Sequence, residues 1–377
     1  MARLALRDVC KSFGSRQVLK NISFQVEDGE LVTILGPSGC GKTTMLRVIA
    51  GIETVDSGEI LIGDRVVNDL PPKDRQVAMV FQEYAIYPHM DVFDNIAYGL
   101  RAHGAPKRLV DEKVRQAAKM LGLADKIHRS PGELSGGELQ RVALCRAIVR
   151  DADVFLFDEP LSNLDPKMRA QVRADIVRIH KTLSLTGVFV THDQVEALTI
   201  GSRVILMNSG EIAQIGRPED LYYEPANTYV ASFMGAPGMN LLEARLTRTG
   251  ERILAEVGDS TLELCGTSMD QALRAFNAAK VDSYVAVILG IRPEDMRFGQ
   301  SEIPASETNQ IRGRLRLIEA LGTERALHFS LVGSNKGEEF IVVTPSRASR
   351  ADLDKEFNVI CDMTRVRLFD HETGEAF

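Results

Sequence analysis

The chain lacks any hydrophobic run long enough to cross a membrane. It has 377 residues, of which 44% are hydrophobic, but no apolar stretch approaches the roughly 18 to 20 residues that a transmembrane helix needs. We therefore do not expect a membrane-spanning chain. The first residues include the acid Asp8 and no long apolar segment, so we do not expect a secretory signal either.

Cysteine is also scarce, and positive charge is not in excess, since 45 Lys and Arg stand against 52 Asp and Glu. The five cysteines lie far apart and form no C-x-x-C pair, a distribution typical of reduced thiols in a cytosolic protein. The formal net charge is −7, which argues against nucleic acid as the main partner, because such binding needs a surface rich in Lys and Arg. Tryptophan is absent, and this absence excludes no function.

Three short apolar runs indicate a buried parallel sheet. Leu31–Leu35, Val154–Phe157 and Gly187–Val190 are continuous hydrophobic segments, as expected for strands covered on both faces. Residues from about 95 to 150 are rich in Ala, Lys, Arg and Leu, which favours a helical insert. We predict an α/β domain over residues 1–235 that contains this helical subdomain.

A turn-rich segment after residue 235 marks a domain boundary. Beyond it, short alternating runs recur, which is the pattern of a small β-barrel. The runs are Leu241–Leu246, Leu262–Cys265, Val285–Leu289, Ile311–Ile318, Ala326–Leu331 and Val366–Phe369. We therefore predict a second, all-β domain over residues 236–377.

The first apolar run is followed by a phosphate-binding loop of the G-x-x-x-x-G-K-[ST] pattern, and a helix-like segment comes next. Glycines let backbone N–H groups point at a polyphosphate, and Lys42 can reach the β- and γ-phosphates. The Thr43 hydroxyl suits Mg²⁺. The alternative is a glycine-rich turn that matches by chance. The nucleotide-binding residues predicted here are Gly36, Pro37, Ser38, Gly39, Cys40, Gly41, Lys42, Thr43 and Thr44.

The other two apolar runs also end in polar residues, and ligands of open parallel sheets bind at these strand ends. Asp158 can orient Mg²⁺, and Glu159 can position or deprotonate a water in line with the γ-phosphate. His192 can hydrogen-bond the γ-phosphate. The alternatives are that the two acids cap the following turn and that the histidine is structural.

Two isolated residues are weaker candidates. Gln82 follows another strand-like run and can contact the water or Mg²⁺, or it is simply a polar surface residue. Phe13 can stack on adenine, or it belongs to the core.

A second glycine-hinged turn, Leu134–Arg141, contains Ser135, Gly136 and Gly137. The N–H and hydroxyl groups of this turn suit an anion, yet it belongs to the helical insert and not to the lobe that carries Lys42. One subunit can therefore use this turn to bind the ATP of a partner. Closure would then depend on ATP, and hydrolysis would reopen the pair.

In this order and spacing, the motifs resemble the full set found in ABC-type ATPases. They are Gly36–Thr44, Gln82, Leu134–Arg141, Phe155–Glu159, Ser162–Asp165 and His192. The resemblance implies a head-to-tail homodimer with two ATP molecules between subunits, Mg²⁺ as the metal, and Asp165 among the residues of the shared site.

Motifs in the C-terminal part are similar to those of the importer ATPases for maltose and glycerol-3-phosphate. They are Leu221–Asn227, Gly238–Asn240, Gly290–Glu294, Leu368–Asp370 and Glu372–Gly374. In that family they lie in and before a regulatory domain of OB-like barrels. The resemblance implies an ATPase that powers uptake of a carbohydrate or a glycerol-3-phosphate-like solute.

The same resemblance implies the partners and the location of the chain. It implies two transmembrane permease subunits that dock near residues 82–89, a solute-binding protein that acts through them, and a peripheral place on the cytoplasmic face of the inner (plasma) membrane. The sequence does not identify the solute.

Two residues depart from the family pattern. Glu138 replaces the usual Gln of the second glycine turn, and Asp295 replaces a His after Arg-Pro-Glu. We expect the Glu138 carboxylate to point away from the phosphate, because two anions repel each other.

Three other classes of protein fit less well. Soluble ABC ATPases of translation or DNA repair usually have two cassettes or a long coiled coil. A P-loop kinase or GTPase does not need Leu134–Arg141, and the guanine-reading Asn-Lys-x-Asp is absent. A catalytically dead binding module is disfavoured because Lys42, Asp158, Glu159 and His192 are all present.

Overall fold

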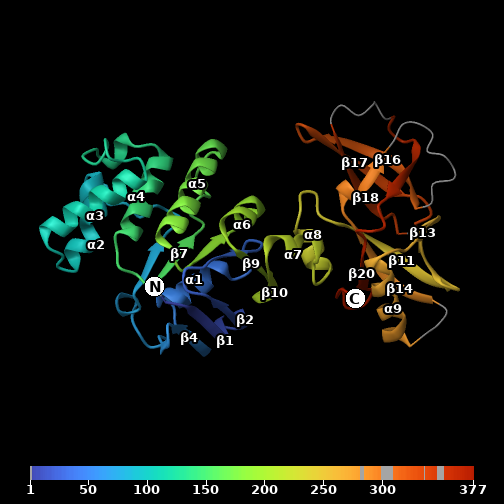
Figure 1. The fold of residues 1–377 in the computed structure, drawn as a ribbon, viewed down its shortest axis with the longest axis horizontal. Coiled ribbons are helices and arrows are strands. Elements are labelled where there is room, and N and C mark those ends of the chain that lie inside the picture. The colour runs from blue at the N-terminus through green and yellow to red at the C-terminus, as the bar shows by residue number, and fades with distance from the viewer. Residues whose placement is uncertain (1, 281–283, 299–308, 335, 346–351) are drawn as a thin grey trace. The chain divides into compact units, whose positions relative to one another are not determined.

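The computed structural model describes the chain except residues 1, 281–283, 299–308, 335 and 346–351. The chain divides into two compact units, Met1–Pro218 and Glu219–Phe377. In Figure 1 the first unit runs from blue to yellow-green and the second from yellow to red. In the described part of the chain, no helix is both long and apolar enough to span a bilayer.

A six-stranded sheet lies at the centre of the first unit, in the order β10-β9-β3-β8-β7-β6. Neighbouring strands run parallel from β9 to β6, and β10 pairs antiparallel with β9. The strands are β3 (Leu31–Leu35), β6 (Val77–Val80), β7 (Val154–Asp158), β8 (Gly187–Thr191), β9 (Arg203–Asn208) and β10 (Glu211–Gly216).

The register of the central strands sets the position of their polar ends. Leu35 of β3 lies opposite Thr191 of β8, and Asp158 of β7 lies opposite Val190. The three strands therefore end at nearly the same level, and the loops that follow them leave from one edge of the sheet.

Side chains of the central strands alternate between two hydrophobic cores. On β7, Val154 and Leu156 pack into the core that contains α1, while Phe155 and Phe157 pack into the core that contains the helical insert. Because both faces are covered, β3, β7 and β8 are buried along their whole length. This explains why the sequence shows continuous apolar runs here and no polar alternation.

Six helices and a smaller antiparallel sheet complete the first unit (Figure 1). The helices are α1 (Lys42–Ala50), α2 (Val92–Ala102), α3 (Lys107–Met120), α4 (Gly136–Ile148), α5 (Pro166–Leu183) and α6 (Gln194–Ile200). The sheet has the order β2-β1-β4-β5, built from β1 (Leu4–Phe13), β2 (Arg16–Val26), β4 (Ser57–Ile62) and β5 (Arg65–Val66). Short 3₁₀ turns occur at Pro72–Asp74 and Pro131–Glu133.

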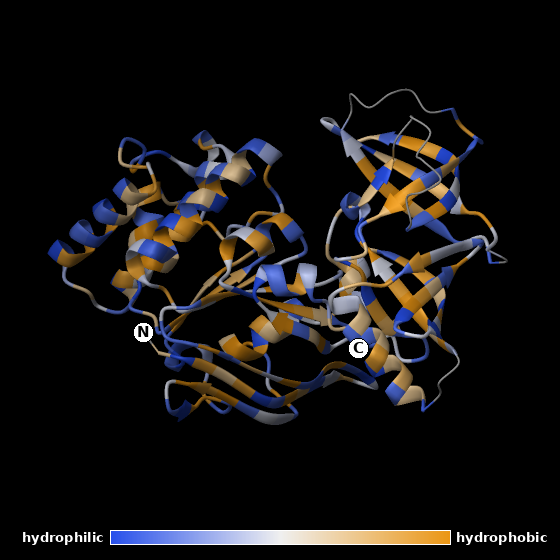
Figure 2. Ribbon diagram, turned by 45° about the vertical axis from the view of Figure 1, so that its right-hand side comes forward, coloured by the Kyte–Doolittle hydropathy of each residue, from blue (hydrophilic) through white to orange (hydrophobic). Residues whose placement is uncertain are grey.

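The described residues of the second unit form two five-stranded antiparallel sheets, ordered β13-β12-β11-β14-β20 and β15-β19-β16-β17-β18. Their strands are β11 (Asn240–Thr249), β12 (Arg252–Val257), β13 (Ser260–Glu263), β14 (Tyr284–Ile291), β15 (Met296–Phe298), β16 (Gln310–Ala320), β17 (Glu324–Leu331), β18 (Glu339–Pro345), β19 (Glu356–Cys361) and β20 (Arg367–Asp370). A 3₁₀ turn covers Pro293–Asp295. One hydrophobic core joins both sheets, and Figure 2 shows it as orange residues along the strands.

Helix α9 (Thr267–Ala279) is an element that the strand pattern did not predict. Its residues Ala272, Ala275 and Phe276 are buried in the same core as the strands. The helix adds to the barrel-like fold without changing its class.

The second unit begins before the predicted boundary at residue 235. Helices α7 (Pro218–Tyr223) and α8 (Thr228–Phe233) precede that point, but they bond to C-terminal segments. The guanidinium of Arg292 donates to the carbonyls of Tyr222, Ala231 and Met234, and Thr228 N–H donates to Gly374 O (2.8 Å). These hydrogen bonds hold both helices to the β-rich unit.

Candidate functional site

The phosphate-binding loop lies between β3 and α1, where its glycines are needed. Gly41 caps α1 with φ 110°, a backbone conformation that residues other than glycine rarely adopt. A Cβ at this position would also lie 2.9 Å from the Val18 carbonyl oxygen. The chain therefore needs glycine here to turn from the loop into the helix.

The loop wraps around the ammonium group of Lys42. This side chain is only 4% exposed, and its Nζ donates to Gly36 O (2.8 Å) and Pro37 O (3.0 Å). The nearest carboxylate oxygen is Glu159 Oε1, at 3.8 Å. A buried ammonium is costly unless polar groups surround it, and the two carbonyls provide this here. Lys42 also lines the cavity over the loop, where an anionic ligand can contact it.

A cavity of about 290 Å³ opens over the loop. Its lining residues are Phe13, Arg16, Val18, Ser38, Gly39, Gly41, Lys42, Thr43, Thr44 and Glu159. A hollow with glycine backbone, hydroxyl groups and two cationic side chains fits a polyphosphate.

Asp158 and Thr43 form a second polar pair beside the loop. Thr43 Oγ1 donates to Asp158 Oδ1 at 3.1 Å, and Asp158 is 7% exposed. Burial raises the pKa of Asp158, the negative charge of Glu159 adds to this, and the Thr43 hydrogen bond opposes it. A divalent cation would relieve the cost of the buried carboxylate. Mg²⁺ prefers oxygen ligands and binds to few protein groups, so a carboxylate and a hydroxyl side by side fit this ion.

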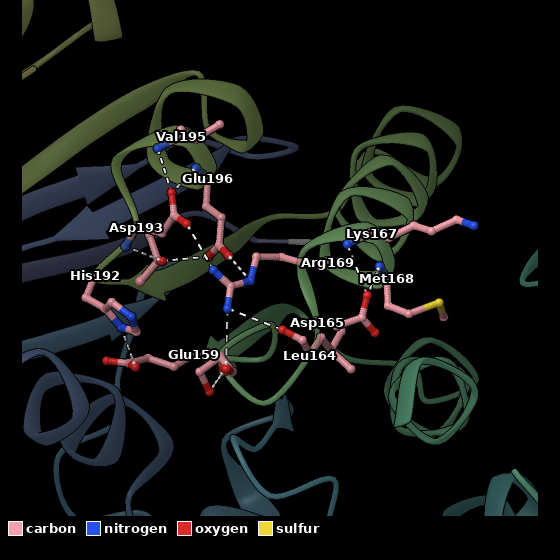
Figure 3. Close-up of polar contacts among 12 residues, drawn as sticks. Glu159, Leu164, Asp165, Lys167, Met168, Arg169, His192, Asp193, Val195 and Glu196 are labelled. Atoms are coloured by element: carbon pink, nitrogen blue, oxygen red, sulfur yellow. Dashed lines mark hydrogen bonds and ion pairs between the residues drawn. The ribbon is translucent and has the colours of Figure 1, made fainter. Parts of the chain in front are cut away.

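Glu159 contacts both Lys42 and His192. Its Oε2 lies 2.8 Å from His192 Nδ1, opposite the Oε1 contact with Lys42, and Figure 3 shows the glutamate and histidine side by side. The backbone at Glu159 has φ 43°, and its N–H bonds to Val190 O (3.1 Å). This left-handed turn costs roughly 1–2 kcal/mol, and it directs the carboxylate over the loop, where a water can be positioned.

Phe13 and Gln82 lie in different surroundings. Phe13 is the last residue of β1, lines the cavity and is 48% exposed. The alternative interpretation, that Phe13 is a core residue, is therefore wrong. Gln82 follows β6 with an exposed side chain, and its carbonyl accepts a hydrogen bond from Asn163 Nδ2 (3.1 Å). In the described residues, no hydrogen bond joins the Gln82 amide to Thr43 or Asp158.

The second glycine turn starts helix α4, with Ser135 as the N-terminal cap. Glu138 Oε2 accepts from Ser135 N–H at 2.8 Å, and Glu138 Oε1 pairs with the Lys126 ammonium. A Cβ on Gly137 would collide with Met168. None of Ser135, Gly136 and Gly137 belongs to the residues that line the Lys42 cavity.

Asp165 caps the start of α5. Its Oδ1 accepts from the backbone N–H groups of Lys167 and Met168, both at 3.1 Å (Figure 3). These bonds satisfy donors that the helix itself leaves free.

Sequence reasoning missed Arg169, which joins two of the predicted motifs. Its guanidinium lies 3.3 Å from Asp193 Oδ2 and 3.8 Å from Glu196 Oε1, and donates to the Leu164 carbonyl at 3.3 Å (Figure 3). The loop that ends at Asp165 is thus tied to the turn that follows His192. The sequence does contain a signal for these contacts. An arginine lies one helical turn after Asp165, and two acidic residues follow His192 within four positions.

Two family models match the chain. One, described as "ABC transporter", covers residues 19–162, and the other, described as "MalK OB fold domain", covers residues 235–296. Both matches confirm the predicted fold class of a P-loop domain followed by an OB-type domain.

Curated relatives align over nearly the whole chain. The trehalose/maltose import ATP-binding protein MalK of Thermococcus litoralis is 45% identical, with 100% of both chains aligned. The sn-glycerol-3-phosphate import ATP-binding protein UgpC of Chromobacterium violaceum is 45% identical over 99% of this chain and 95% of that protein. The sulfoquinovosyl glycerol transport ATP-binding protein SmoE of Agrobacterium fabrum is 42% identical over 100% and 99%.

The chain therefore belongs to the ABC transporter family, among the ATP-binding subunits that carry a MalK-type OB domain. It is an ATPase, and the predicted resemblance is confirmed.

Proposed function

We propose that the chain hydrolyses MgATP at a site completed by a second copy of itself, and that it powers import through separate permease subunits. The observation that carries the proposal is the position of Glu159 between Lys42 and His192. Lys42 would bind the phosphates, Thr43 and Asp158 would hold Mg²⁺, and Glu159 would position the attacking water. Bound Mg²⁺ would supply positive charge next to the transferred phosphoryl group.

The shared site follows from what the Lys42 cavity lacks. Gly136 and Gly137 lie in the first turn of helix α4, where backbone N–H groups suit an anion, whereas the Ser135 N–H already bonds to Glu138. None of the three residues is among those that line the cavity. A head-to-tail pair of chains would bring the turn of one subunit to the ATP of the other. Gln82 would then contact the water or Mg²⁺, and Phe13 would stack on the adenine. Asp165 would belong to the nucleotide-binding residues of the shared site.

Mixed subunits test the shared site. A Ser135→Arg chain keeps Lys42, and a Lys42→Ala chain keeps Ser135, so each homodimer has two defective sites while the heterodimer has one complete site. We expect the mixture to recover part of the wild-type ATPase rate, above either variant alone. Differently tagged chains, purified through both tags, supply the heterodimer for the measurement. No recovery in proven heterodimers would count against the proposal.

The permease subunits would dock on a groove next to residues 82–89. The groove has a volume of about 370 Å³, and Ile52, Tyr84, Tyr87, Tyr98 and Arg146 are among its lining residues. Ile52 and Tyr98 are 49% and 43% exposed and line the same groove, and exposed apolar side chains that are grouped in this way are typical of protein contacts. Docking here would keep the chain on the cytoplasmic face of the membrane as a peripheral subunit.

The solute class comes from the relatives. They are named for trehalose and maltose, sn-glycerol-3-phosphate and sulfoquinovosyl glycerol. We propose a carbohydrate or a glycerol-3-phosphate-like solute, which the permease subunits and a solute-binding protein would select.

The C-terminal unit would regulate or stabilise the dimer. Every predicted catalytic residue lies before residue 218, so chains that end at Pro218 or at Gly235 should bind MgATP within about threefold of the full chain and dimerise more weakly. The chain that ends at Gly235 keeps α7 and α8 without their C-terminal partners. The chain that ends at Pro218 is therefore the better variant for this test. A folded truncated chain that lost MgATP binding would contradict this division of roles.

A further inference from the structure

Glu138 places a negative charge at the turn that the proposed function assigns to a partner's ATP. Its Oε2 accepts from Ser135 N–H at 2.8 Å, so the carboxylate lies against the first turn of α4. An uncompensated carboxylate at this position would repel a γ-phosphate that approaches Ser135. A turn that accepts a phosphate therefore needs a feature that offsets the charge of Glu138.

Lys126 supplies the opposite charge. Its ammonium contacts Glu138 Oε1 directly, and the two side chains are only 24% and 17% exposed. The hydrogen bond from Lys126 is the largest cause that lowers the pKa of Glu138 to about 2, and the Ser135 N–H bond lowers it further. Glu138 is therefore charged at any physiological pH, and protonation cannot remove its charge.

The backbone holds Lys126 in a fixed position. Its N–H donates to Leu123 O (3.0 Å), its carbonyl accepts from Arg129 N–H (3.0 Å), and the next residue, Ile127, is 5% exposed in the hydrophobic core. These bonds fix the point from which the Lys126 side chain extends, and that side chain is itself only 24% exposed. The pair therefore connects the loop after α3 to the first turn of α4.

We propose that Lys126 is a positioning residue of the shared ATP site, which neutralises Glu138 so that the turn at Ser135 can accept the phosphates of a partner's ATP. The proposal rests on the shared site of the proposed function. Lys126 would not contact ATP itself. It would act by holding the Glu138 carboxylate against the Lys126 ammonium group and away from the partner's nucleotide.

The rate at which bound ATP is released tests this role. In full-length Glu159→Gln chains, which we expect to hydrolyse ATP very slowly, radiolabelled MgATP is loaded, and the label that remains after desalting is followed over time. Lys126→Met should speed release by about tenfold. Lys126→Arg should keep the parental rate, and Lys126→Met combined with Glu138→Gln should return to within about twofold of it. The increase should shrink in high salt, where charge repulsion is screened.

Lys113→Met is the matched control, because Lys113 on α3 pairs with an exposed acid, Asp151, at 2.9 Å. Its release rate should equal that of the parent. The melting temperature of the nucleotide-free chains separates the proposed role from a structural one. A purely structural pair would change the release rate only in step with the melting temperature.

The inference is wrong if Lys126→Met releases ATP at the parental rate, or if Glu138→Gln fails to reverse its effect. It is also wrong if release only follows the melting temperature across the series. If the Glu159→Gln parent itself retains no ATP, the shared site is wrong and the inference falls with it. Parental retention together with an inert Lys126→Met overturns the inference alone.

Discussion

Glu159→Gln should bind MgATP with nearly wild-type affinity and lose turnover by roughly a hundredfold or more, the usual range for loss of a general base. Gln keeps the size of the side chain and its hydrogen bond to His192, but it cannot take a proton from water. The change also removes the negative charge 3.8 Å from Lys42 Nζ, so phosphate binding should not weaken. Phosphate release and equilibrium nucleotide binding, measured on the same preparation, separate the two effects.

Glu112→Gln is a matched control, because Glu112 is exposed on α3 in the same unit. Its turnover should equal that of the wild type. Hydrolysis at the wild-type rate by Glu159→Gln would show that another group positions the water.

Lys42→Ala should weaken nucleotide binding itself, by about ten- to a hundredfold, as expected when a charged hydrogen-bond donor to phosphate is lost. The change also removes the group that bonds to Gly36 O and Pro37 O, so the loop loses its internal support. Equilibrium binding of a fluorescent ATP analogue measures the loss.

Lys42→Met separates charge from packing, because methionine keeps an unbranched side chain without the ammonium. Its affinity should fall as far as that of the alanine variant. An affinity for Lys42→Met near the wild-type value would mean that packing, and not charge, accounts for the effect of Lys42→Ala.

The sequence predicts the central sheet and the position of the site because the apolar pattern of these strands directly reflects their burial on both faces. Val154 to Phe157 are all apolar since their side chains alternate between two cores, and a polar residue after such a strand must lie at the sheet edge. That reasoning places Asp158, Glu159 and His192 next to the Lys42 loop. It does not place Gln82, whose exposed side chain follows a strand but forms no hydrogen bond to Thr43 or Asp158 in the described residues.

Contacts between segments distant in the chain were beyond sequence reasoning. The Arg292 guanidinium holds the carbonyls of α7 and α8, which assigns these helices to the second unit, and no local pattern reveals such bonds. The pairing of Lys126 with Glu138 likewise depends on the 3₁₀ turn between them. Glu138 was recognised as unusual from the sequence, but its partner required the structure.

Asp295, the other unusual residue, has a structural explanation. It is 9% exposed and accepts a hydrogen bond from Arg365 at 3.1 Å. Burial raises its pKa, and the Arg365 charge opposes the shift. The carboxylate therefore serves an ion pair within the second unit.

Retention of ATP by the Glu159→Gln chain, with and without Ser135→Arg, tests the central claim most directly. A site closed between two subunits predicts one slowly released ATP per chain in Glu159→Gln. Once Ser135→Arg is added, release should be rapid, although MgATP should still bind at the Lys42 site of each single subunit. Equal retention in both variants would contradict the claim, because a single subunit would then enclose its own ATP without the partner's turn.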